Sequence, residues 1–241
     1  MLDDVGADVA LPASVRRVVS LVPSLSESVM DSGLLVGVTD WCPAEIDAAR
    51  VKGTKNPDVD AVIALAPDLV LANAEENREP DLAALRAAGL AVWVTYPRTV
   101  PEALVSLDRM IAACGLPCPG WLTAAEQSWA EPFQGVRRTA LVPIWRRPWM
   151  AVGSGTFTGD VLARLGIDNV LADHEERYPK VDLAALPPYD LVVLPDEPYA
   201  FSRSDGPECF DVPSRCVSGR HLTWYGPSLA EAREVLTAQL G

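Results

Sequence analysis

A glycine- and hydroxyl-rich stretch, Val152–Gly159 (VGSGTFTG), stands directly before an apolar helical pattern. Many proteins bind phosphate at such a place, because the N–H groups at a helix start attract anions. The spacing here is G-x-G-x-x-x-G, whereas a dinucleotide loop needs G-x-G-x-x-G, and no Gly-Lys-Ser/Thr of a P-loop occurs. Ser154 also lacks the G-x-S-x-G surroundings of a hydrolase nucleophile. Nucleotide binding and serine catalysis are therefore disfavoured at this loop.

Two histidines could bind a metal ion. His221 lies three residues before Trp224, and a neutral imidazole there could ligate cobalt or iron, so His221 is a candidate metal ligand. A hydrogen-bonded loop histidine is the simpler interpretation. His174 lies in the charged stretch DHEERY, for which a solvated loop is expected.

The composition is that of a globular protein that can bury a sizeable core. The chain has 241 residues, 49% of them hydrophobic, with 20 basic and 33 acidic side chains and a net charge of -13. Because this charge repels a phosphate backbone and no Lys/Arg stripe offsets it, nucleic acid is not expected as a partner. No segment has the apolar length that membrane insertion needs.

The compartment follows from the N-terminus and the cysteines. The first residues are acidic and show no signal-peptide pattern, so we expect a cytoplasmic location for the chain as written, and a periplasmic or extracytoplasmic one if a leader was removed. Five cysteines form no C-x-x-C zinc pattern, which indicates reduced thiols. Cys209 and Cys216 bracket a short loop and could pair in an oxidising compartment.

Short apolar runs alternate with helical patterns along the chain. Arg17–Pro23 predicts a buried strand ended by proline, and the helix that follows has the capping-box spacing at Ser24 and Glu27. Val59–Ala72 predicts a short helix and then a strand, and Leu82–Pro97 predicts a helix, a glycine stop and a strand. This alternation predicts an α/β fold with open parallel sheets.

The second half of the chain repeats the first. Thr139–Pro143 (TALVP) matches Val19–Pro23 (VSLVP), and Val181–Leu194 aligns without a gap with Val59–Ala72. Helical patterns without strand signal separate the halves. We therefore expect two open parallel-sheet lobes joined by a helical backbone, with a ligand cleft between them and ligand-facing loops at the carboxyl ends of the strands. The expected parts are an N-terminal lobe (1–100), a helical linker (101–136) and a C-terminal lobe (137–241).

Five stretches in order carry a resemblance to a known family. They are RVVSLVPSLSE, ALAPDLVLA, PWMAVGSGTFTGDVLARLGIDNVL, YDLVVLPDEP and LTWYGPSLAEA, spread from about residue 16 to residue 240. Together they resemble the helical-backbone metal-receptor superfamily, the single-linker-helix periplasmic binding proteins, and most of all its members that bind cobalamin for the vitamin uptake ABC transporter. The resemblance implies a large metal chelate held without chemical turnover, so no catalytic residue and no catalytic cofactor are expected.

The resemblance also implies which side chains face the ligand. A corrinoid such as cobalamin is a wide, mostly apolar disc with amides at its rim, so its site needs aromatic faces and neutral hydrogen-bond donors. The implied ligand-binding residues are Pro23, Ser24, Trp41, Asn73, Tyr96, Trp145, Ser154, Thr156, Phe157, Trp224 and Tyr225.

Partners and alternatives remain open at this point. Members that dock on an ABC permease present a surface glutamate on each lobe; Asp60 stands in the first such place, and Trp224–Ser228 contains no acid for the second. A cytoplasmic carrier, sensor or biosynthetic accessory for the same ligand class is therefore also considered. Haem or a ferric siderophore is the alternative ligand. An α/β enzyme acting on a small acid or nucleotide-sugar, with Glu197 among its carboxylates, is the alternative of another class.

Overall fold

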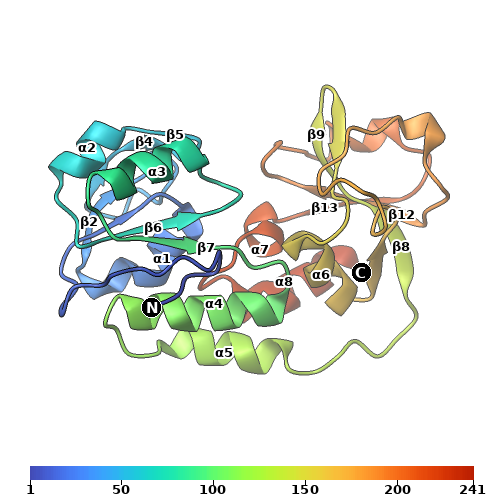
Figure 1. The fold of residues 1–241 in the computed structure, drawn as a ribbon. Helices are drawn as coiled ribbons and strands as arrows, with labels where there is room; N and C mark the ends of the chain where they lie inside the picture. Colours follow the sequence, from blue (N-terminus) through green and yellow to red (C-terminus); the bar gives the residue numbers. More distant parts are fainter. The chain divides into compact units, whose positions relative to one another are not determined.

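The computed structural model describes residues 1–241, which form two compact units (Figure 1). Each unit contains an open parallel sheet with helices, as the sequence predicts. The short segment Tyr225–Pro227 belongs to the N-terminal unit, although the residues before and after it belong to the C-terminal unit. The N-terminal unit consists of Met1–Pro97, Glu102–Thr123 and Tyr225–Pro227, and the C-terminal unit of Arg98–Pro101, Ala124–Trp224 and Ser228–Gly241.

The sheet of the N-terminal unit has five strands, all parallel, in the order β3-β2-β1-β6-β7. Every side chain of β1, β6 and β7 is buried, because these runs of mostly apolar residues are covered on both faces. The strands are β1 (Val18–Ser20), β2 (Leu35–Val38), β3 (Ala49–Arg50), β6 (Leu69–Asn73) and β7 (Val92–Thr95).

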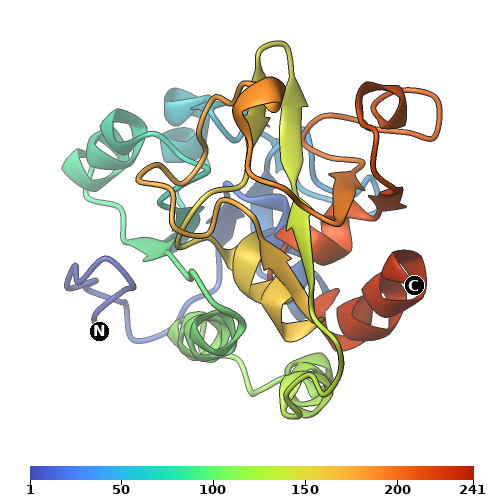
Figure 2. The same cartoon turned by 90° about the vertical axis from the view of Figure 1, so that its right-hand side faces the viewer.

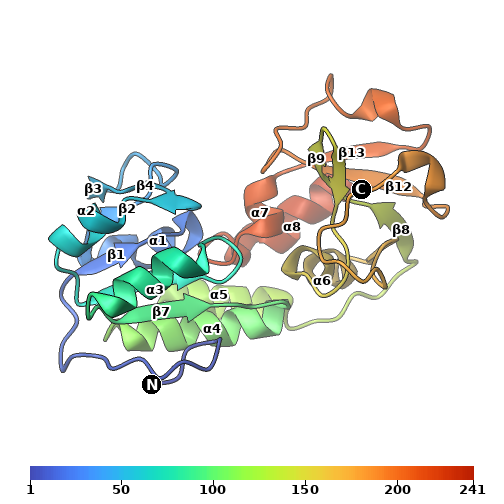
Figure 3. The same cartoon turned by 45° about the horizontal axis from the view of Figure 1, so that its top comes forward.

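Helices cover both faces of this sheet. The helix α1 leads from β1 to β2 in one direction along the sheet, and α3 leads from β6 to β7 in the other. Because both crossovers are right-handed, the two helices lie on opposite faces (Figures 1 and 3). The helical elements are α1 (Pro23–Val29), the 3-10 turn η1 (Met30–Ser32), α2 (Val59–Ala64) and α3 (Glu79–Ala87); a small antiparallel hairpin joins β4 (Lys52–Gly53) to β5 (Asn56–Pro57).

The sheet of the C-terminal unit has four parallel strands in the order β11-β8-β12-β13. An antiparallel hairpin, β9–β10, follows β8 and stands above the sheet in Figure 2. The strands are β8 (Arg138–Leu141), β9 (Pro143–Arg146), β10 (Trp149–Ala151), β11 (Ile167–Asn169), β12 (Leu191–Pro195) and β13 (Ser214–Val217); the helices are α6 (Phe157–Arg164), α7 (Gly219–Thr223) and α8 (Leu229–Leu240), with 3-10 turns η2 (Leu183–Ala185) and η3 (Pro207–Cys209).

Two helices occupy the middle of the chain, α4 (Val100–Ala113) and α5 (Gly120–Trp129). Gly115 follows α4 with φ +73°, a left-handed conformation that ends a helix at little cost for glycine. Pro117 and Pro119 then keep the connection to α5 from continuing as one helix. None of the helices combines the length and the apolarity that crossing a bilayer requires.

The internal repeat is visible in the sheets, with a corrected alignment. Val18 pairs with Leu69 in the N-terminal unit, and Ala140 pairs with Leu191 in the C-terminal unit. Val18 therefore corresponds to Ala140, and the prediction that equated Val19–Pro23 with Thr139–Pro143 was wrong by two residues. Both stretches contain Leu-Val-Pro, but the two prolines are not equivalent in the structure. Pro23 starts a helix, whereas Pro143 starts the hairpin strand β9.

Equivalent carboxylates hold the two central strands. Asp68 Oδ2 accepts the N–H groups of Arg16 (2.7 Å) and Arg17 (2.9 Å) just before β1. Asp190 Oδ2 accepts the N–H of Thr139 (2.6 Å) and its hydroxyl (2.9 Å) at the start of β8. Each aspartate directly precedes the neighbouring strand, so the same device fixes the start of the central strand pair in both units.

The predicted capping box at Ser24 and Glu27 was also wrong. The helix α1 begins two residues earlier, with Val22 as N-cap, Pro23 in the first turn and no side-chain cap. Proline favours this first helical position because its missing N–H would be unpaired there anyway. Ser24 and Glu27 are therefore buried inside the helix, where both side chains pack against the unit.

We expect Asp190→Asn to lower the melting temperature at neutral pH. The hydrogen bonds from Thr139 hold the pKa of Asp190 below its ordinary value of 3.8. A lowered folded-state pKa means that the stabilisation is complete above about pH 5 and is lost as the pH falls through that pKa. The difference between variant and wild type, followed by calorimetry over pH, should therefore shrink below about pH 4. Asp173→Asn, at an exposed carboxylate in the same unit, is the control; a difference that stays constant to low pH would contradict this account.

Candidate ligand-binding edges

The carboxyl ends of the parallel strands form one edge in each unit. We call the loops after β1, β2, β6 and β7 the first edge, and the segments after β8, β11, β12 and β13 the second edge. Open α/β sheets bind ligands at this end, beside the point where the strand order reverses. That point lies between β1 and β6 in the N-terminal unit and between β8 and β12 in the C-terminal unit.

Asn73, at the end of β6, organises the first edge. Its Nδ2 donates to the carbonyl of Thr95 (2.9 Å) and to the hydroxyl oxygen of Tyr225. Its Oδ1 accepts the N–H groups of Glu75 (2.8 Å) and Glu76 (3.0 Å). The side chain is buried, and both ends of its amide are used by the protein itself. Asn73 thus shapes the loop after β6.

A second asparagine closes the switch point. Asn77 Oδ1 accepts the backbone N–H of Asn73 (2.9 Å). Its Nδ2 donates to the carbonyls of Leu21 (3.3 Å) and Thr54 (2.9 Å). Since Leu21 follows β1 and Asn73 ends β6, Asn77 ties together the two loops that diverge at the switch point.

Tyr225 belongs to this network. Its hydroxyl lies 3.2 Å from Thr95 Oγ1, and Thr95 Oγ1 in turn donates to the carbonyl of Ala72 (3.1 Å). Burial raises the pKa of the Tyr225 phenol far above its ordinary value of 10, so the ring stays neutral at any physiological pH. The structure therefore places Tyr225 as a buried anchor of the segment Tyr225–Pro227.

Ser24 lies next to that segment. A Cβ on Gly226 would stand 2.8 Å from the Ser24 carbonyl oxygen, so only glycine allows this approach. Ser24 is buried, its carbonyl accepts the Ser28 hydroxyl (2.8 Å), and Pro23 before it is half-buried. Of the two predicted site residues, Ser24 is therefore the one that packs directly against Gly226.

Tyr96 follows β7 and is half-buried. Its backbone N–H donates to Asp4 Oδ2 (2.9 Å), and the same carboxylate accepts the Ser106 hydroxyl and pairs with Arg109 Nη1 (3.0 Å). Asp4 thus connects the end of β7 to α4. Trp41, after β2, has a different setting, because this residue is 71% exposed.

The glycine-rich loop of the second edge is shaped by close packing. Gly153 N–H donates to the Arg177 carbonyl (2.7 Å), and a Cβ at Gly153 would stand only 2.1 Å from the Glu176 carbonyl oxygen. Asn169 Nδ2 donates to the carbonyls of Val152 (2.9 Å) and Gly153 (3.1 Å). Gly153 is therefore required by the neighbouring backbone of the protein.

Three predicted site residues, Ser154, Thr156 and Phe157, lie at the start of α6. Thr156 is buried and caps α6, accepting the Gly159 N–H at 3.2 Å. Phe157 is buried in the first turn of that helix, and Ser154 is half-buried in the loop before it. Of these three predicted residues, Ser154 has the most accessible position.

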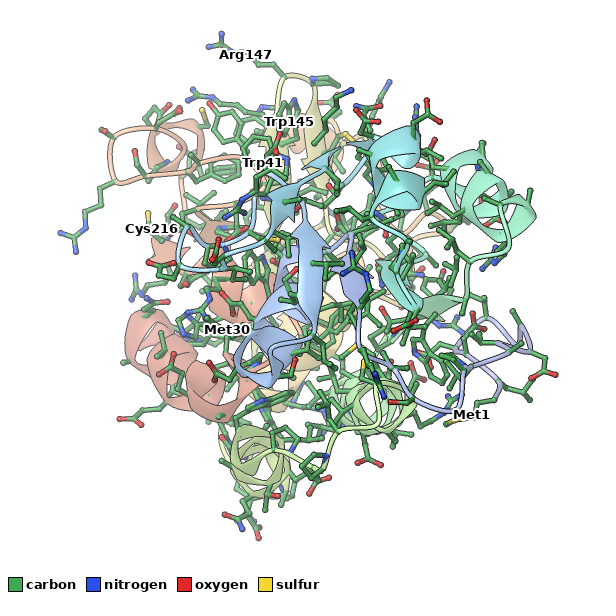
Figure 4. The ribbon with its side chains drawn as sticks, turned by 90° about the vertical axis from the view of Figure 1, so that its left-hand side faces the viewer. Met1, Met30, Trp41, Trp145, Arg147 and Cys216 are labelled. Carbon is green, nitrogen blue, oxygen red and sulfur yellow. The ribbon has the colours of Figure 1, made fainter.

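The hairpin β9–β10 carries an aromatic cluster. Trp145, 44% exposed, meets Tyr199 edge-on at 5.6 Å between ring centroids, and Tyr199 lies against Phe201 at 4.6 Å. Trp149 stacks parallel to Phe201 at 6.2 Å and packs against the core of the unit, as its apolar surroundings predict. Arg147 extends from the hairpin tip into solvent (Figure 4).

The Trp145 ring has an electrostatic support behind it. Tyr199 donates its hydroxyl to Asp205 Oδ2 (2.7 Å), and Arg146 forms ion pairs with Asp205 and with Glu208 (2.6 Å). The Tyr199 ring that contacts Trp145 is therefore held through Asp205 by Arg146, which lies on the same hairpin as Trp145.

Trp224 is fixed through its indole nitrogen. Nε1 donates to Glu197 Oε2 (3.1 Å), and the Arg220 guanidinium lies 5.9 Å from the ring centroid. Glu197 follows β12, and Asp196 beside it accepts the N–H of Gly219 (2.6 Å) at the start of α7. Both carboxylates thus position the segment that carries Trp224.

His221 uses both ring nitrogens within the protein. Nδ1 lies 2.8 Å from the Ser218 hydroxyl and Nε2 lies 3.1 Å from Glu231 Oε1. The structure contains no group of three His, Cys, Asp or Glu side chains that could hold a metal ion. His174 Nδ1 accepts the N–H of Glu176 (2.9 Å) in its loop, and all five cysteines, Cys209 and Cys216 included, are free thiols.

Sequence reasoning missed the side chains that hold the three tryptophan rings at the edges. These are Arg50 for the loop of Trp41, Tyr199 for Trp145 and Glu197 for Trp224. The sequence indicated Glu197 as a possible acid or base and as part of a ligand-facing loop, but not as the partner of Trp224. Arg50 gave no signal because a single arginine in a short strand is common. The pattern Arg146–Tyr199–Asp205 joins residues far apart in sequence, which only folding brings together.

We expect Tyr225→Phe to destabilise the protein by about 1–2 kcal/mol, because it removes the acceptor of Asn73 Nδ2 and the donor to Thr95 inside a buried network. Urea denaturation measures this difference. Tyr189→Phe is the matched control, since the structure gives that hydroxyl no hydrogen-bond partner in the protein. Equal losses in the two variants would contradict the anchor role.

Comparison with known proteins places these edges in context. No protein-family model matches the chain. The vitamin B12-binding protein of Vibrio cholerae serotype O1 is 24% identical over 188 residues, which cover 72% of this chain and 67% of that protein.

Solved structures match over nearly the whole chain. The periplasmic vitamin B12 binding protein of Vibrio cholerae has a TM-score of 0.73 at 18% identity, covering 95% of this chain and 98% of that one. A periplasmic heme-binding protein from Roseiflexus sp. RS-1 has a TM-score of 0.74 at 19% identity, covering 94% and 98%.

These three proteins are all named as binding proteins, and none as an enzyme. The two structures are two-lobed periplasmic binding proteins, so the α/β fold predicted from the sequence is confirmed. The resemblance found in the sequence is confirmed with it: this chain has the fold of the helical-backbone metal-receptor superfamily of non-enzymatic binding proteins.

Proposed function

We propose that this protein binds a corrinoid-like metal chelate, with cobalamin as the reference ligand, and releases it unchanged. The observation that carries the proposal is the set of tryptophan rings at the carboxyl edges, each supported from behind by polar or charged groups. Trp41 and Trp145 are exposed, and Trp224 is half-buried. Flat apolar faces backed by rigid polar supports suit a wide disc with a polar rim.

The vitamin B12-binding relatives support the same ligand class. Asn73, Thr156 and Tyr225, predicted to contact the ligand, are buried and occupied, so we assign them a role in shaping the edges. The ligand-contacting set that we propose from the predicted residues is Trp41, Tyr96, Trp145, Ser154 and Trp224, with Pro23, Ser24 and Phe157 beneath the surface.

The settings of His221 and Tyr225 favour a corrinoid over haem. Haem iron in proteins takes an axial ligand such as His, Cys, Met or Tyr, whereas cobalamin brings its own lower ligand. His221 has partners at both nitrogens, and the raised pKa of buried Tyr225 disfavours its phenolate. His221 as a metal ligand is therefore not part of the proposal.

Haem or a ferric chelate is the second candidate, favoured by the heme-binding structural neighbour. The half-buried Tyr96 at the end of β7 is the side chain that such a ligand would use. Under this alternative, hemin added to the protein gives a shifted Soret band that Tyr96→Phe removes.

An enzyme acting on a small acid or nucleotide-sugar has less support. Glu197 accepts the indole N–H of Trp224, and burial raises the pKa of the Cys114 thiol to about 12, which leaves it unreactive at neutral pH. The related proteins are named for binding.

The ligand is carried in transport or sensing under this proposal. Asp60, exposed in the first turn of α2, is the position through which the resemblance implies docking to an ABC permease. The structural neighbours are periplasmic proteins, which favours a role outside the cytoplasm over that of a cytoplasmic carrier.

Titration with cyanocobalamin tests the main proposal. We expect saturable binding by calorimetry and a higher melting temperature, because a ligand that binds only the folded state stabilises it. Hemin is titrated in parallel. No heat and no thermal shift with excess cyanocobalamin would reject a corrinoid, and a response to hemin alone would select the second candidate.

Trp224→Ala should weaken cyanocobalamin binding by about 1–3 kcal/mol, since it removes one aromatic face from the second edge. The dissociation constant from calorimetry measures the loss. Trp121→Ala, on α5, which belongs to neither edge, is the matched control. Unchanged affinity in Trp224→Ala would show that this ring does not contact the ligand.

A further inference from the structure

The loop that carries Trp41 is held more firmly than its exposure suggests. Trp41 is 71% exposed, whereas Cys42 next to it is buried. A large apolar ring displayed to water on an ordered loop is a common feature of binding surfaces. Contacts around the Trp41 loop restrict the orientation of this ring.

Arg50 supplies the first support. Its Nη1 donates to the carbonyls of Thr39 (3.0 Å) and Cys42 (3.1 Å), and its Nη2 donates to those of Pro43 (3.0 Å) and Ile46 (3.3 Å). One planar guanidinium thus satisfies four carbonyls of the loop from both sides of Trp41. A lysine cannot reproduce this fork geometry.

A small core lies beneath the loop. Cys42 Sγ lies 3.1 Å from the Ser26 hydroxyl and 3.3 Å from the Thr39 hydroxyl. Cys42 and Ile46 pack with Val38 into their own apolar cluster. The loop therefore has a buried base, and Arg50 fixes its backbone above that base.

Gly53 limits where the indole can lie. A Cβ on Gly53 would stand 3.2 Å from Trp41 Nε1, which is closer than ordinary contact. The backbone of Gly53 is not in the left-handed region, so alanine can adopt its backbone conformation, and the added Cβ acts only by pressing on the indole. The neighbouring Lys52 accepts the Asp40 N–H through its carbonyl (2.9 Å), and its Nζ pairs with Asp58 (2.8 Å), which holds the β4–β5 hairpin against the loop.

We propose that Arg50 and Gly53 are positioning residues that hold the Trp41 indole in one orientation for stacking on a flat ligand. Arg50 fixes the backbone that carries the ring, and the missing side chain at Gly53 leaves the space that the ring edge occupies. This inference deepens the proposed function and rests on it for the identity of the ligand.

The indole N–H signal of Trp41 in a proton–nitrogen NMR spectrum tests the positioning without any ligand. Trp41→Phe identifies the signal by its loss. We expect Arg50→Met to split or broaden it and Gly53→Ala to shift it. In contrast, Arg86→Met, at an arginine of the same unit that pairs with Glu79, leaves the signal unchanged. An unmoved signal in both Arg50→Met and Gly53→Ala overturns the proposal. Gly53→Ala removes no contact, so it remains informative if Arg50→Met fails to fold.

Calorimetry with cyanocobalamin tests the consequence for binding. We expect Arg50→Met, Arg50→Lys and Gly53→Ala each to weaken binding by about 3- to 10-fold, the range for one well-placed aromatic contact. The same changes should have no further effect in a Trp41→Ala background, because the ring they position is then absent.

The outcomes separate the two proposals. If the wild type binds and only Trp41→Ala weakens binding, the positioning role is overturned and the proposed function stands. If the wild type does not bind cyanocobalamin, the proposed ligand is rejected, and the NMR result alone decides the positioning role.

Discussion

The first edge depends on one amide. Asn73 ends a fully buried strand, and its side chain holds the loop after β6, the end of β7 and the hydroxyl of Tyr225 together. A buried amide with all groups satisfied is stable, whereas losing one partner leaves an unpaired polar group in a low-dielectric interior. Tyr225 lies in the segment Tyr225–Pro227, which belongs to the N-terminal unit although the residues before and after it belong to the C-terminal unit. The Asn73 amide therefore also anchors this segment.

The three tryptophan rings at the edges share a physical arrangement. Trp41 lies on a loop whose carbonyls accept hydrogen bonds from Arg50. Trp145 contacts a tyrosine that donates to Asp205. The indole N–H of Trp224 donates to Glu197. A ring held in place before binding loses less conformational freedom when a ligand arrives. Polar groups behind the rings leave the apolar faces available, which suits a ligand recognised mainly by stacking.

The two units show how a repeated sheet diverges at its carboxyl edge. The amino ends keep the same device, an aspartate that accepts N–H groups at the start of the central strand. The carboxyl ends differ, since α1 follows β1 directly whereas the β9–β10 hairpin follows β8. The Val181–Leu194 repeat also forms only a 3-10 turn where α2 forms a helix, because Pro187 and Pro188 exclude a longer one.

The sequence by itself determined the parallel α/β fold, the repeat, the resemblance to the superfamily and the loops that lie on the two edges. Apolar runs such as the β6 strand and glycine or proline stops are local signals, and local signals suffice for these features. The sequence-based prediction misplaced the start of α1 and the alignment of the repeat. Proline can start either a helix or a strand, and a short match of residue types does not define which strand residues pair.

Only the tertiary structure decided which predicted residues face outward. From the sequence alone, polar side chains such as those of Asn73, Thr156 and Tyr225 suit ligand contact equally well. In the structure they are buried and hydrogen-bonded within the protein. Their partners are distant in sequence, as Tyr225 is from Asn73, so no local pattern reports them. Burial and hydrogen-bond pairing are properties of the packed chain, and they alone separate a side chain that binds from one that supports.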